Sequence, residues 1–415
     1  MRRFVVLAVA NAPVPDGACR RATSGFVSPY GNADIDARAA SAATMDAMRD
    51  AIDLVSAQRS RPLLFDELPD LAKRTPWTPL AHVPTAIEPC SAIGTWLGRR
   101  DGVFMKRDDL VSPLYGGNKV RRYEYVLADA KARNAKRIVT VGGLASTQAM
   151  ATTLFGRALG FEVCVVLFDQ PVTRFARDSV RGFIANGAEV VYGGGYVMTG
   201  VRAWRAMQRG ADNYFIMAGA AGPLANLGYV DAMLELAQQV ERGEMPRPDV
   251  IVLPTGSSGT LAALALGAAH LGWDTEIIGV RITSAVVCNR LMVGAVVRST
   301  DRHLAARDHR WKPMRDRVHY SLYGGALGPG YGHPTKGALE GAAQNEVLTG
   351  ASGEVTYSGK ALAGMRALLA EPRHQGKVFL VWNTLSKVRP ILPSTPSTPS
   401  LPPSLRWIFD GEPVA

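Results

Sequence analysis

Short apolar runs alternate with helical patterns between residues 100 and 280. The apolar runs are rich in Val, Ile and Leu and end at glycine or polar turns, which predicts buried strands. These runs lie at residues 102–106, 138–141, 161–168, 189–192, 249–253 and 275–280. Apolar residues recur every three or four positions at 123–132, 149–159, after Asp178, 230–241 and 261–271, which predicts helices. Strands that are almost continuously apolar and separated by helices indicate parallel sheets covered on both faces, and therefore an α/β fold.

The two ends of the chain differ from this pattern. Residues 1–60 are rich in Ala, Arg and Ser, and we expect a partly disordered extension with one amphipathic helix at about 39–57. Residues 389–415 form a Pro-rich tail, in which prolines recur at nearly three-residue spacing among Ser and Thr: Pro390, Pro393, Pro396, Pro399, Pro402 and Pro403. This pattern predicts a loose, polyproline-like tail outside the core, and a ligand for a proline-recognising module is the alternative.

The composition is that of a folded protein. The chain has 415 residues, of which 47% are hydrophobic and 20% are charged, and this excludes a wholly disordered chain. At about 150 residues per domain, the length predicts two or three domains. No stretch reaches the roughly 18 uninterrupted apolar residues of a membrane-spanning helix, so we expect no membrane partner.

The formal net charge of +11 is compatible with a nucleic-acid partner. The basic residues are scattered or paired, however, and no run of five or more occurs. We therefore favour a solvated basic surface that helps to attract an anionic substrate or cofactor, and we expect no nucleic-acid partner. Strong, salt-dependent retention on DNA would distinguish the two interpretations.

The four cysteines are far apart and form no CxxC pair, so neither a zinc site nor a disulfide framework is indicated. They are Cys19, Cys90, Cys164 and Cys288. The histidines show no HExxH spacing, and we expect no metal site. A reducing, cytoplasmic location fits best. Export is the alternative, because Arg2-Arg3 and the apolar run 4–10 resemble a short signal peptide.

A glycine-rich turn follows the strand predicted at 249–253. Its residues are Thr255, Gly256, Ser257, Ser258, Gly259 and Thr260, and an Ala/Leu-rich helix follows. Glycines let the backbone approach a ligand closely, and the N–H groups at a helix start attract an anion. The turn has no P-loop lysine and does not match GxGxxG, which disfavours a nucleoside triphosphate or a dinucleotide. A plain strand-to-helix connection is the alternative.

A second turn carries a lysine at a helix start. Lys106-Arg-Asp-Asp109 is followed by Tyr115-Gly-Gly-Asn118-Lys119, and a helix begins directly after it. The positive end of the helix dipole should lower the pKa of the Lys119 amine, and a neutral amine is the nucleophile that a Schiff base requires. A solvated surface lysine is the alternative.

A third turn again runs from a strand through Gly-Gly to a helix start. It spans residues 141–148 and ends in Ser146, Thr147 and Gln148. Hydroxyls and free N–H groups in such a turn can bind a ligand carboxylate. Ordinary helix capping by Ser146 or Thr147 is the alternative.

Together these three segments resemble the pyridoxal-phosphate-dependent family of 1-aminocyclopropane-1-carboxylate (ACC) deaminase and D-cysteine desulfhydrase. The similarity runs from about Arg61 to Thr384, and its most specific part is Lys106–Asp109 followed by Gly116-Gly-Asn-Lys119-x-Arg121. The resemblance implies a two-domain α/β fold of the tryptophan-synthase-β type (fold type II). A small domain (123–228) would be inserted into a large cofactor-binding domain (61–122 and 229–388), with the cofactor in the cleft between them.

The resemblance also implies roles for individual residues. Lys119 would bind pyridoxal phosphate covalently and then accept or return the substrate α-proton, while the 255–260 turn would hold the phosphate. The catalytic set would comprise Lys119, Ser146, Tyr331 and Tyr357; Asn118, Thr147 and Ser358 would contact the cofactor, and Ser146, Thr147 and Gln148 the substrate. The tyrosines belong to Gly330-Tyr-Gly332 and Val355–Lys360, and would stack on the ring or relay protons.

Position 358 bears on the reaction. The ACC deaminases have Glu there, beside the pyridine nitrogen, whereas desulfhydrase-like members have Thr. By this resemblance, Ser358 would leave the ring largely neutral, which favours β-elimination over cyclopropane opening. Gln148 points the other way, because the deaminases have Gln at that position. We weight the hydroxyl more heavily, since it concerns the electronics of the cofactor directly.

The sequence therefore predicts a lyase or deaminase that acts on a small amino acid, most simply D-cysteine desulfhydrase-like α,β-elimination to a 2-keto acid and ammonia. ACC deamination is the alternative enzyme, and a homodimer is expected. The chain departs from the family at Thr147, which replaces Asn, and at Trp382-Asn-Thr-Leu-Ser386, which replaces a segment ending in Gly-Gly. These departures motivate a third hypothesis, a non-catalytic relative that binds the cofactor.

Overall fold

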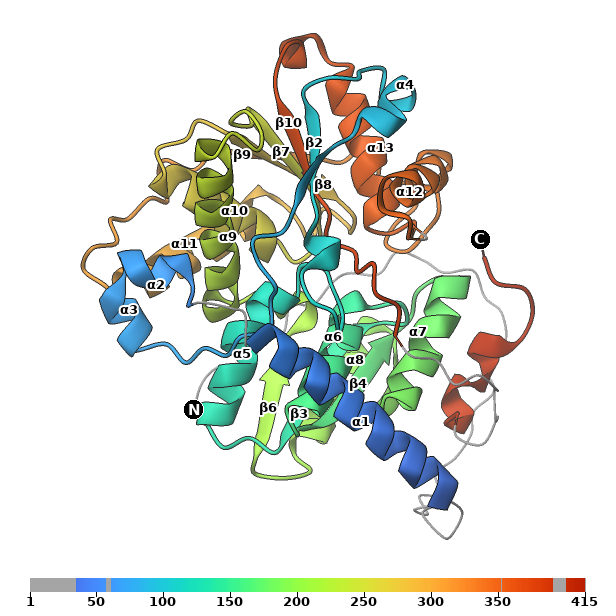
Figure 1. Cartoon of the computed structure of the whole chain (residues 1–415). Helices are drawn as coiled ribbons and strands as arrows, with labels where there is room; N and C mark the ends of the chain where they lie inside the picture. The colour runs from blue at the N-terminus through green and yellow to red at the C-terminus, as the bar shows by residue number, and fades with distance from the viewer. Residues whose placement is uncertain (1–34, 57–60, 352, 391–400, 415) are drawn as a thin grey trace.

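The strands form two sheets, one of six strands and one of four (Figure 1). The structure is a computed structural model that describes residues 35–56, 61–351, 353–390 and 401–414. The larger sheet has the order β1 (Ile87–Pro89), β2 (Val103–Lys106), β10 (Phe379–Trp382), β7 (Val250–Thr255), β8 (Glu276–Arg281), β9 (Tyr320–Tyr323). The smaller has the order β5 (Glu189–Gly194), β4 (Glu162–Phe168), β3 (Arg137–Gly143), β6 (Asn213–Ile216). All neighbouring strands run parallel except the pair of β1 and β2, so the predicted α/β fold is confirmed.

Helices surround both sheets. They are α1 (Ile35–Ser56), α2 (Leu63–Glu67), α3 (Pro69–Lys73), α4 (Gly94–Leu97), α5 (Val120–Ala132), α6 (Thr147–Ala158), α7 (Arg174–Ala185), α8 (Tyr196–Met207), α9 (Pro223–Glu241), α10 (Gly259–His270), α11 (Arg290–Ala305), α12 (Lys336–Thr349) and α13 (Ser358–Leu369). Each helical pattern of the sequence falls on one of them. Helix α9 begins earlier than its apolar pattern, because Pro223 in its first turn has the backbone geometry of a helix start.

Strand β7 shows why its sequence is apolar from Val250 to Pro254. Ile251 and Leu253 pack into the core that α9 and α10 form on one face of the sheet. Val250 and Val252 point the other way and pack with Leu362 and other residues of α13. Both faces of the strand are therefore buried, as expected for a parallel sheet between two helix layers.

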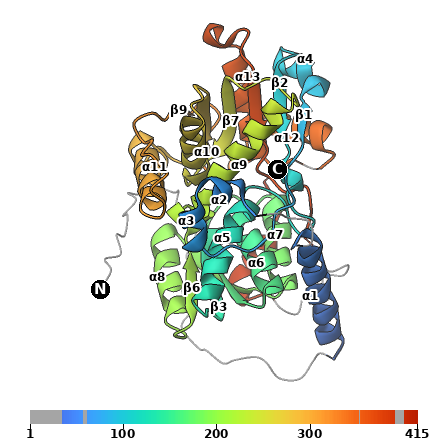
Figure 2. The ribbon, with the colours of Figure 1, turned by 60° about the vertical axis from the view of Figure 1, so that its left-hand side comes forward.

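The smaller sheet is built from a continuous part of the chain. Its four strands fall between residues 123 and 228, and the strands of the larger sheet fall before and after this interval. The chain leaves the larger sheet through α5 and returns through α9, and these two helices pack against each other. Figure 2 shows the two sheets one above the other, with α5 and α9 at their junction.

Both described ends of the chain pack against the smaller sheet's helical layer. Met48 and Ile52 of α1 are buried in the same core as Leu405 and Ile408, which follow the prolines. Arg177 donates hydrogen bonds to the carbonyls of Ile408, Asp410 and Gly411. The prediction of a loose tail is therefore wrong for residues 401–414, because the apolar residues that follow the prolines are buried where this segment packs against α7.

Some sequence predictions lie outside the described residues, namely the apolar run 4–10, Cys19 and the prolines within 391–400. The other three cysteines, Cys90, Cys164 and Cys288, are free and buried. Within the described ranges, every helix is too short or too polar to cross a membrane.

Candidate active site

The turn between β7 and α10 carries unpartnered backbone donors. Thr255 ends β7 and Gly259 begins α10, and Ser258 between them adopts a left-handed conformation with φ +66°. A residue other than glycine rarely adopts this conformation, and such strain is concentrated at ligand sites. None of the N–H groups of residues 256–260 donates a hydrogen bond within the part of the chain that the structure describes. The turn therefore offers free donors at a helix N-terminus, as an anion requires.

Arg122 of α5 faces this turn. Its guanidinium donates to the Thr260 hydroxyl at 2.7 Å and to the carbonyls of Gly219 and Ala220 at 3.0 and 3.1 Å. A Cβ on Gly259 would lie 2.7 Å from the guanidinium, so glycine there lets the arginine reach the turn. Burial lowers the pKa of Arg122 to about 10. Its Nε has no partner, and among the described residues it forms no ion pair, which indicates that a ligand supplies the counter-charge.

Lys119 lies two hydrogen bonds away from Thr260. Its Nζ donates to Asn118 Oδ1 at 2.6 Å, and Asn118 Nδ2 donates to Thr260 Oγ1 at 3.1 Å. The lysine directly precedes α5 and is buried. Burial, and then the charge of Arg122, lowers the pKa of Lys119 to about 7. A large fraction of the amine is therefore neutral near pH 7 and able to act as a nucleophile.

The Gly-Gly pair lets the lysine turn pack against the chain that leaves β10. Gly117 has φ +87°, and a Cβ there would lie 2.5 Å from the carbonyl oxygen of Thr384. The N–H of Gly116 donates to Ser386 Oγ at 2.7 Å, and that of Asn118 to the Thr384 carbonyl at 3.2 Å. The segment in which this chain departs from the family therefore supports the lysine turn, and the Ser386 hydroxyl contributes directly.

Tyr331 and Tyr357 form a hydrogen-bonded pair. Their hydroxyls are 2.6 Å apart, and their rings meet edge to face with centroids 6.2 Å apart. Burial raises the pKa of both phenols, so both are protonated at neutral pH. The Tyr331 ring packs against Phe168 at the end of β4, and Thr147 lies close enough to the Tyr357 hydroxyl to offset part of the rise in the pKa of Tyr357 that burial causes. The structure thus brings together the predicted residues Tyr331, Tyr357 and Thr147 at the ends of the smaller sheet's strands.

The side chains of Ser146 and Gln148 are engaged within the protein. Ser146 Oγ accepts the N–H of Ala149 and caps α6, which was the alternative role for this residue. Gln148 Nε2 donates to the hydroxyls of Thr140 and Thr152. The backbone N–H groups of residues 147 and 148 have no partner among the described residues. A carboxylate would therefore meet the backbone of this turn, and the predicted side-chain contacts to substrate stay predictions.

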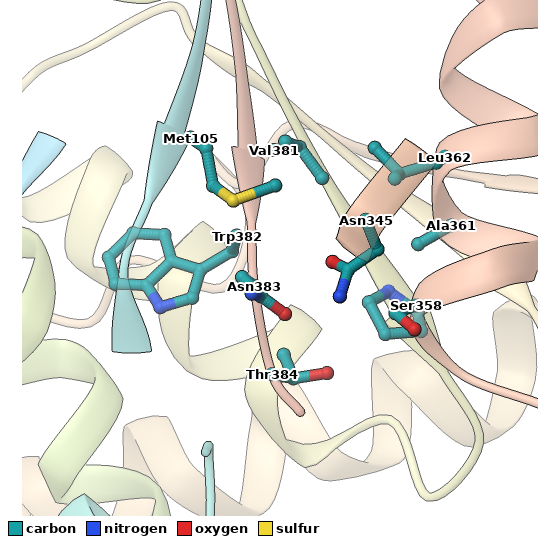
Figure 3. A pocket seen from close by; sticks show the side chains of 10 residues that line it. Met105, Asn345, Ser358, Ala361, Leu362, Val381, Trp382, Asn383 and Thr384 are labelled. Atoms are coloured by element: carbon teal, nitrogen blue, oxygen red, sulfur yellow. The ribbon is translucent and has the colours of Figure 1, made fainter. Parts of the chain in front are cut away.

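A small cavity lies where β2, β7 and β10 end beside the start of α13 (Figure 3). It is lined by Met105, Pro254, Asn345, Ser358, Ala361, Leu362, Val381, Trp382, Asn383 and Thr384. The Ser358 hydroxyl donates to the Glu354 carbonyl at 3.0 Å. Asn383 is buried, and its side-chain nitrogen has no partner within the described chain. This amide is a free donor for a ligand or water, and the sequence indicated it only as part of a divergent segment.

Behind the lysine turn, buried charges are paired with one another. Lys106 Nζ lies 2.6 Å from Glu235, and Arg121 lies 3.0 Å from Asp108 and 2.8 Å from Glu235. Trp382 Nε1 donates to Asp108 at 2.7 Å. These residues connect β2, α5, α9 and β10. Lys106, Asp108 and Arg121 of the most specific sequence motif therefore position the turn, and Lys119 of the same motif is left for ligand binding.

Comparisons with known proteins identify the family of the chain. Residues 78–384 match the family described as "Pyridoxal-phosphate dependent enzyme". D-cysteine desulfhydrase of Salmonella schwarzengrund (strain CVM19633) is 30% identical over 307 residues, which are 70% of this chain and 88% of the relative.

Solved structures show the same architecture. A crystal structure of an ACC deaminase homologue matches with a TM-score of 0.64 and 25% identity, over 80% of this chain and 97% of that one. A fungal L-serine ammonia-lyase from Rhizomucor miehei shares the fold, with a TM-score of 0.52 and 17% identity over 74% of this chain and 95% of that one. The predicted family and fold are confirmed, and the chain belongs to the family of pyridoxal-phosphate-dependent enzymes.

Proposed function

We propose that Lys119, Arg122 and the 255–260 turn hold pyridoxal phosphate, with the phosphate on the turn and the aldehyde at the Lys119 amine. The observation that carries this proposal is the unpaired guanidinium of Arg122 beside the unpartnered N–H groups of the turn. The Thr260 hydroxyl accepts hydrogen bonds from Arg122 and Asn118, so its own proton is free for an anion. The residues present therefore fit a dianionic phosphate next to a reactive amine.

The chain's own residues would handle the protons. Bound pyridoxal phosphate supplies an aldehyde for covalent attachment of an amine and a ring that withdraws electrons from the substrate α-carbon. The pKa of Lys119, about 7, suits a group that accepts the α-proton and later returns it. The free N–H groups of residues 147 and 148 would bind the substrate carboxylate. Within the Tyr331–Tyr357 pair one hydroxyl donates to the other, and the remaining hydroxyl proton would be donated to the leaving group.

The proposed reaction is α,β-elimination on D-cysteine or a related β-substituted amino acid. The α-proton passes to the enzyme, the β-substituent leaves with its bonding electrons, and hydrolysis of the released imine gives a 2-keto acid and ammonia. Ser358 supports elimination, because it places a hydroxyl where a carboxylate would favour a protonated ring nitrogen. The resemblance to a D-cysteine desulfhydrase gives further support.

ACC deamination is the competing activity. It is supported by the resemblance to the ACC deaminase homologue and by Gln148. The second support is weak, because the Gln148 side chain bonds to Thr140 and Thr152 in the interior of the protein.

A paired assay tests the proposal. The protein loaded with pyridoxal phosphate is offered D-cysteine, with sulfide and pyruvate measured, and ACC, with 2-oxobutyrate measured. We expect sulfide and pyruvate in equal amounts and little 2-oxobutyrate. The opposite ratio would establish the deaminase, and bound cofactor without turnover of any small amino acid would establish a non-catalytic relative.

Three further expectations are also proposals. We propose that residues 123–228 form the inserted domain between the two parts of the larger one, that the protein is a homodimer, and that it works in the cytoplasm. The free state of Cys90, Cys164 and Cys288 supports a reducing compartment.

A further inference from the structure

Two buried charged side chains next to the tyrosine pair have no role in the chemistry above. Glu354 and Lys360 flank the start of α13 and are 4% and 0% exposed. A lysine in the first turn of a helix is disfavoured by the helix dipole, and a fully buried one needs compensating partners. The hydrogen bonds that Glu354 and Lys360 form indicate what these two side chains do.

Glu354 holds the backbone at Tyr357. Its two carboxylate oxygens accept the N–H of Tyr357 at 2.8 and 2.9 Å, and one of them also accepts the N–H of Thr356. Its carbonyl accepts the Ser358 hydroxyl and the N–H of Gly359. These bonds close a tight turn around Tyr357 and hold its backbone in place relative to α13.

Lys360 holds the turn that leads into Tyr331. Its Nζ donates to the carbonyls of Leu327 and Gly330, both at 2.8 Å. Gly330 directly precedes Tyr331, so the lysine fixes the backbone next to this tyrosine. Burial raises the pKa of Glu354 to about 7 and lowers that of Lys360 to about 8, and in each case the charge of the other partly offsets the shift.

We propose that Glu354 and Lys360 are positioning residues for the Tyr331–Tyr357 pair and together set its 2.6 Å hydroxyl contact. The inference rests on the proposed function, in which this pair serves the substrate. Neither charged group would touch the reacting atoms. Because a misplacement of about 1 Å can lower a rate by about 100-fold, we expect their loss to reduce kcat more than it raises KM.

We call Glu354 and Lys360, with the backbone groups that they bind, the clamp. Hydrogen exchange of the cofactor-free protein tests the clamp independently of any activity measurement. In Lys360→Met, exchange in peptides that cover residues 324–332 should rise about tenfold, which corresponds to local opening. In Glu354→Ala, hydrogen exchange should instead increase in peptides that cover residues 354–358. Glu354→Gln keeps an acceptor oxygen and should therefore restore part of the protection. Lys336→Met and Glu346→Gln change exposed residues of the neighbouring α12 and serve as matched controls.

A double-mutant cycle tests whether the clamp acts through the tyrosines. Lys360→Met should lower kcat for D-cysteine about tenfold with KM changed less than about twofold, and in the Tyr357→Phe background it should add less than about twofold. Independent losses in the two backgrounds would overturn the proposal. So would an exchange increase spread over the whole chain, or none in 324–332. If wild type does not use D-cysteine, the proposed function fails, but the exchange result still decides the clamp.

Discussion

Arg121 and Arg122 are adjacent in the sequence and equally buried, yet their surroundings are opposite. Arg121 pairs with the carboxylates of Asp108 and Glu235, which raises its pKa further. Among the described residues Arg122 donates its hydrogen bonds to neutral groups and forms no ion pair, and its pKa is lowered. The first arginine belongs to a closed ionic network behind the lysine turn, and the second to an open cluster around the 255–260 turn.

The difference separates a region that supports the fold from a region that awaits a ligand. Burying a charge without a counter-charge raises the free energy of the folded protein. Such an open cluster is therefore expected where a bound ligand supplies the counter-charge. The network needs no ligand because its charges neutralise one another. The open cluster combines Arg122, the Lys119 amine with its lowered pKa, and unpartnered N–H groups, and a phosphorylated aldehyde satisfies all three.

Breaking the closed network should have the largest effect. Arg121→Met leaves Asp108 and Glu235 buried near each other without the arginine, and should lower the free energy of unfolding by about 3–5 kcal/mol. Urea unfolding of the cofactor-free protein measures it. Arg133→Met, at an exposed position directly after the same helix, should change stability by less than about 0.5 kcal/mol. Equal effects of the two substitutions would refute the assigned network.

Removing the amine from the open cluster should stabilise the cofactor-free protein. The pKa of Lys119 falls from 10.5 to about 7 on folding, so the unfolded chain holds this proton more tightly. The wild type therefore loses stability as the pH falls from 10.5 towards 7, and Lys119→Met avoids the loss. We expect a gain of about 2–4 kcal/mol at pH 7 that disappears above pH 10.5. Unfolding measurements at several pH values determine this gain, with exposed Lys131→Met as the control. A gain of the same size at every pH would contradict the explanation.

Removing the unpaired charge should cost ligand affinity and little stability. Arg122→Met should weaken pyridoxal phosphate binding about 10- to 100-fold, since a charge-assisted contact to phosphate is lost. The free energy of unfolding of the cofactor-free protein should fall by less than about 1 kcal/mol. Fluorescence titration with the cofactor measures the affinity. Unchanged affinity together with a large loss of stability would place Arg122 with the structural network instead.

The smallest effect is expected where the two regions meet. Ser386→Ala leaves the buried N–H of Gly116 without its partner and should lower the free energy of unfolding by about 1–2 kcal/mol. Ser386→Thr keeps the hydroxyl and should recover most of the loss. If Ser386→Ala leaves the free energy of unfolding unchanged, the divergent segment does not support the lysine turn.

The sequence predicted the strands and turns whose signals are local. The central residues of β3, β4, β7 and β8 are mostly apolar because both faces of these strands are buried, and two of the three Gly-containing turns, at 141–148 and 255–260, stand directly after predicted strands. β10 was not predicted, since only four residues separate Val378 from Asn383. The C-terminal segment was misjudged because its prolines outweighed the apolar residues after them, although Leu405 and Ile408 are fully buried.

Within the site, the sequence indicated Lys119 and the 255–260 turn but neither Arg122 nor Asn383. Two adjacent arginines look alike in a sequence. Which of them has a carboxylate nearby depends on α9, more than a hundred residues further along the chain. The unpartnered amide of Asn383 likewise becomes visible only when β10 and α13 are placed side by side.

Borohydride reduction followed by peptide mapping tests the central claim most directly. Several lysines are buried, but Lys106 is bound to Glu235 and Lys360 to two carbonyls, whereas Lys119 faces the open cluster. With pyridoxal phosphate added, the untreated protein should absorb at about 410–430 nm. After reduction, the cofactor should be found on Lys119 alone. A label on Lys106 or Lys360, or no label at all, would contradict this account.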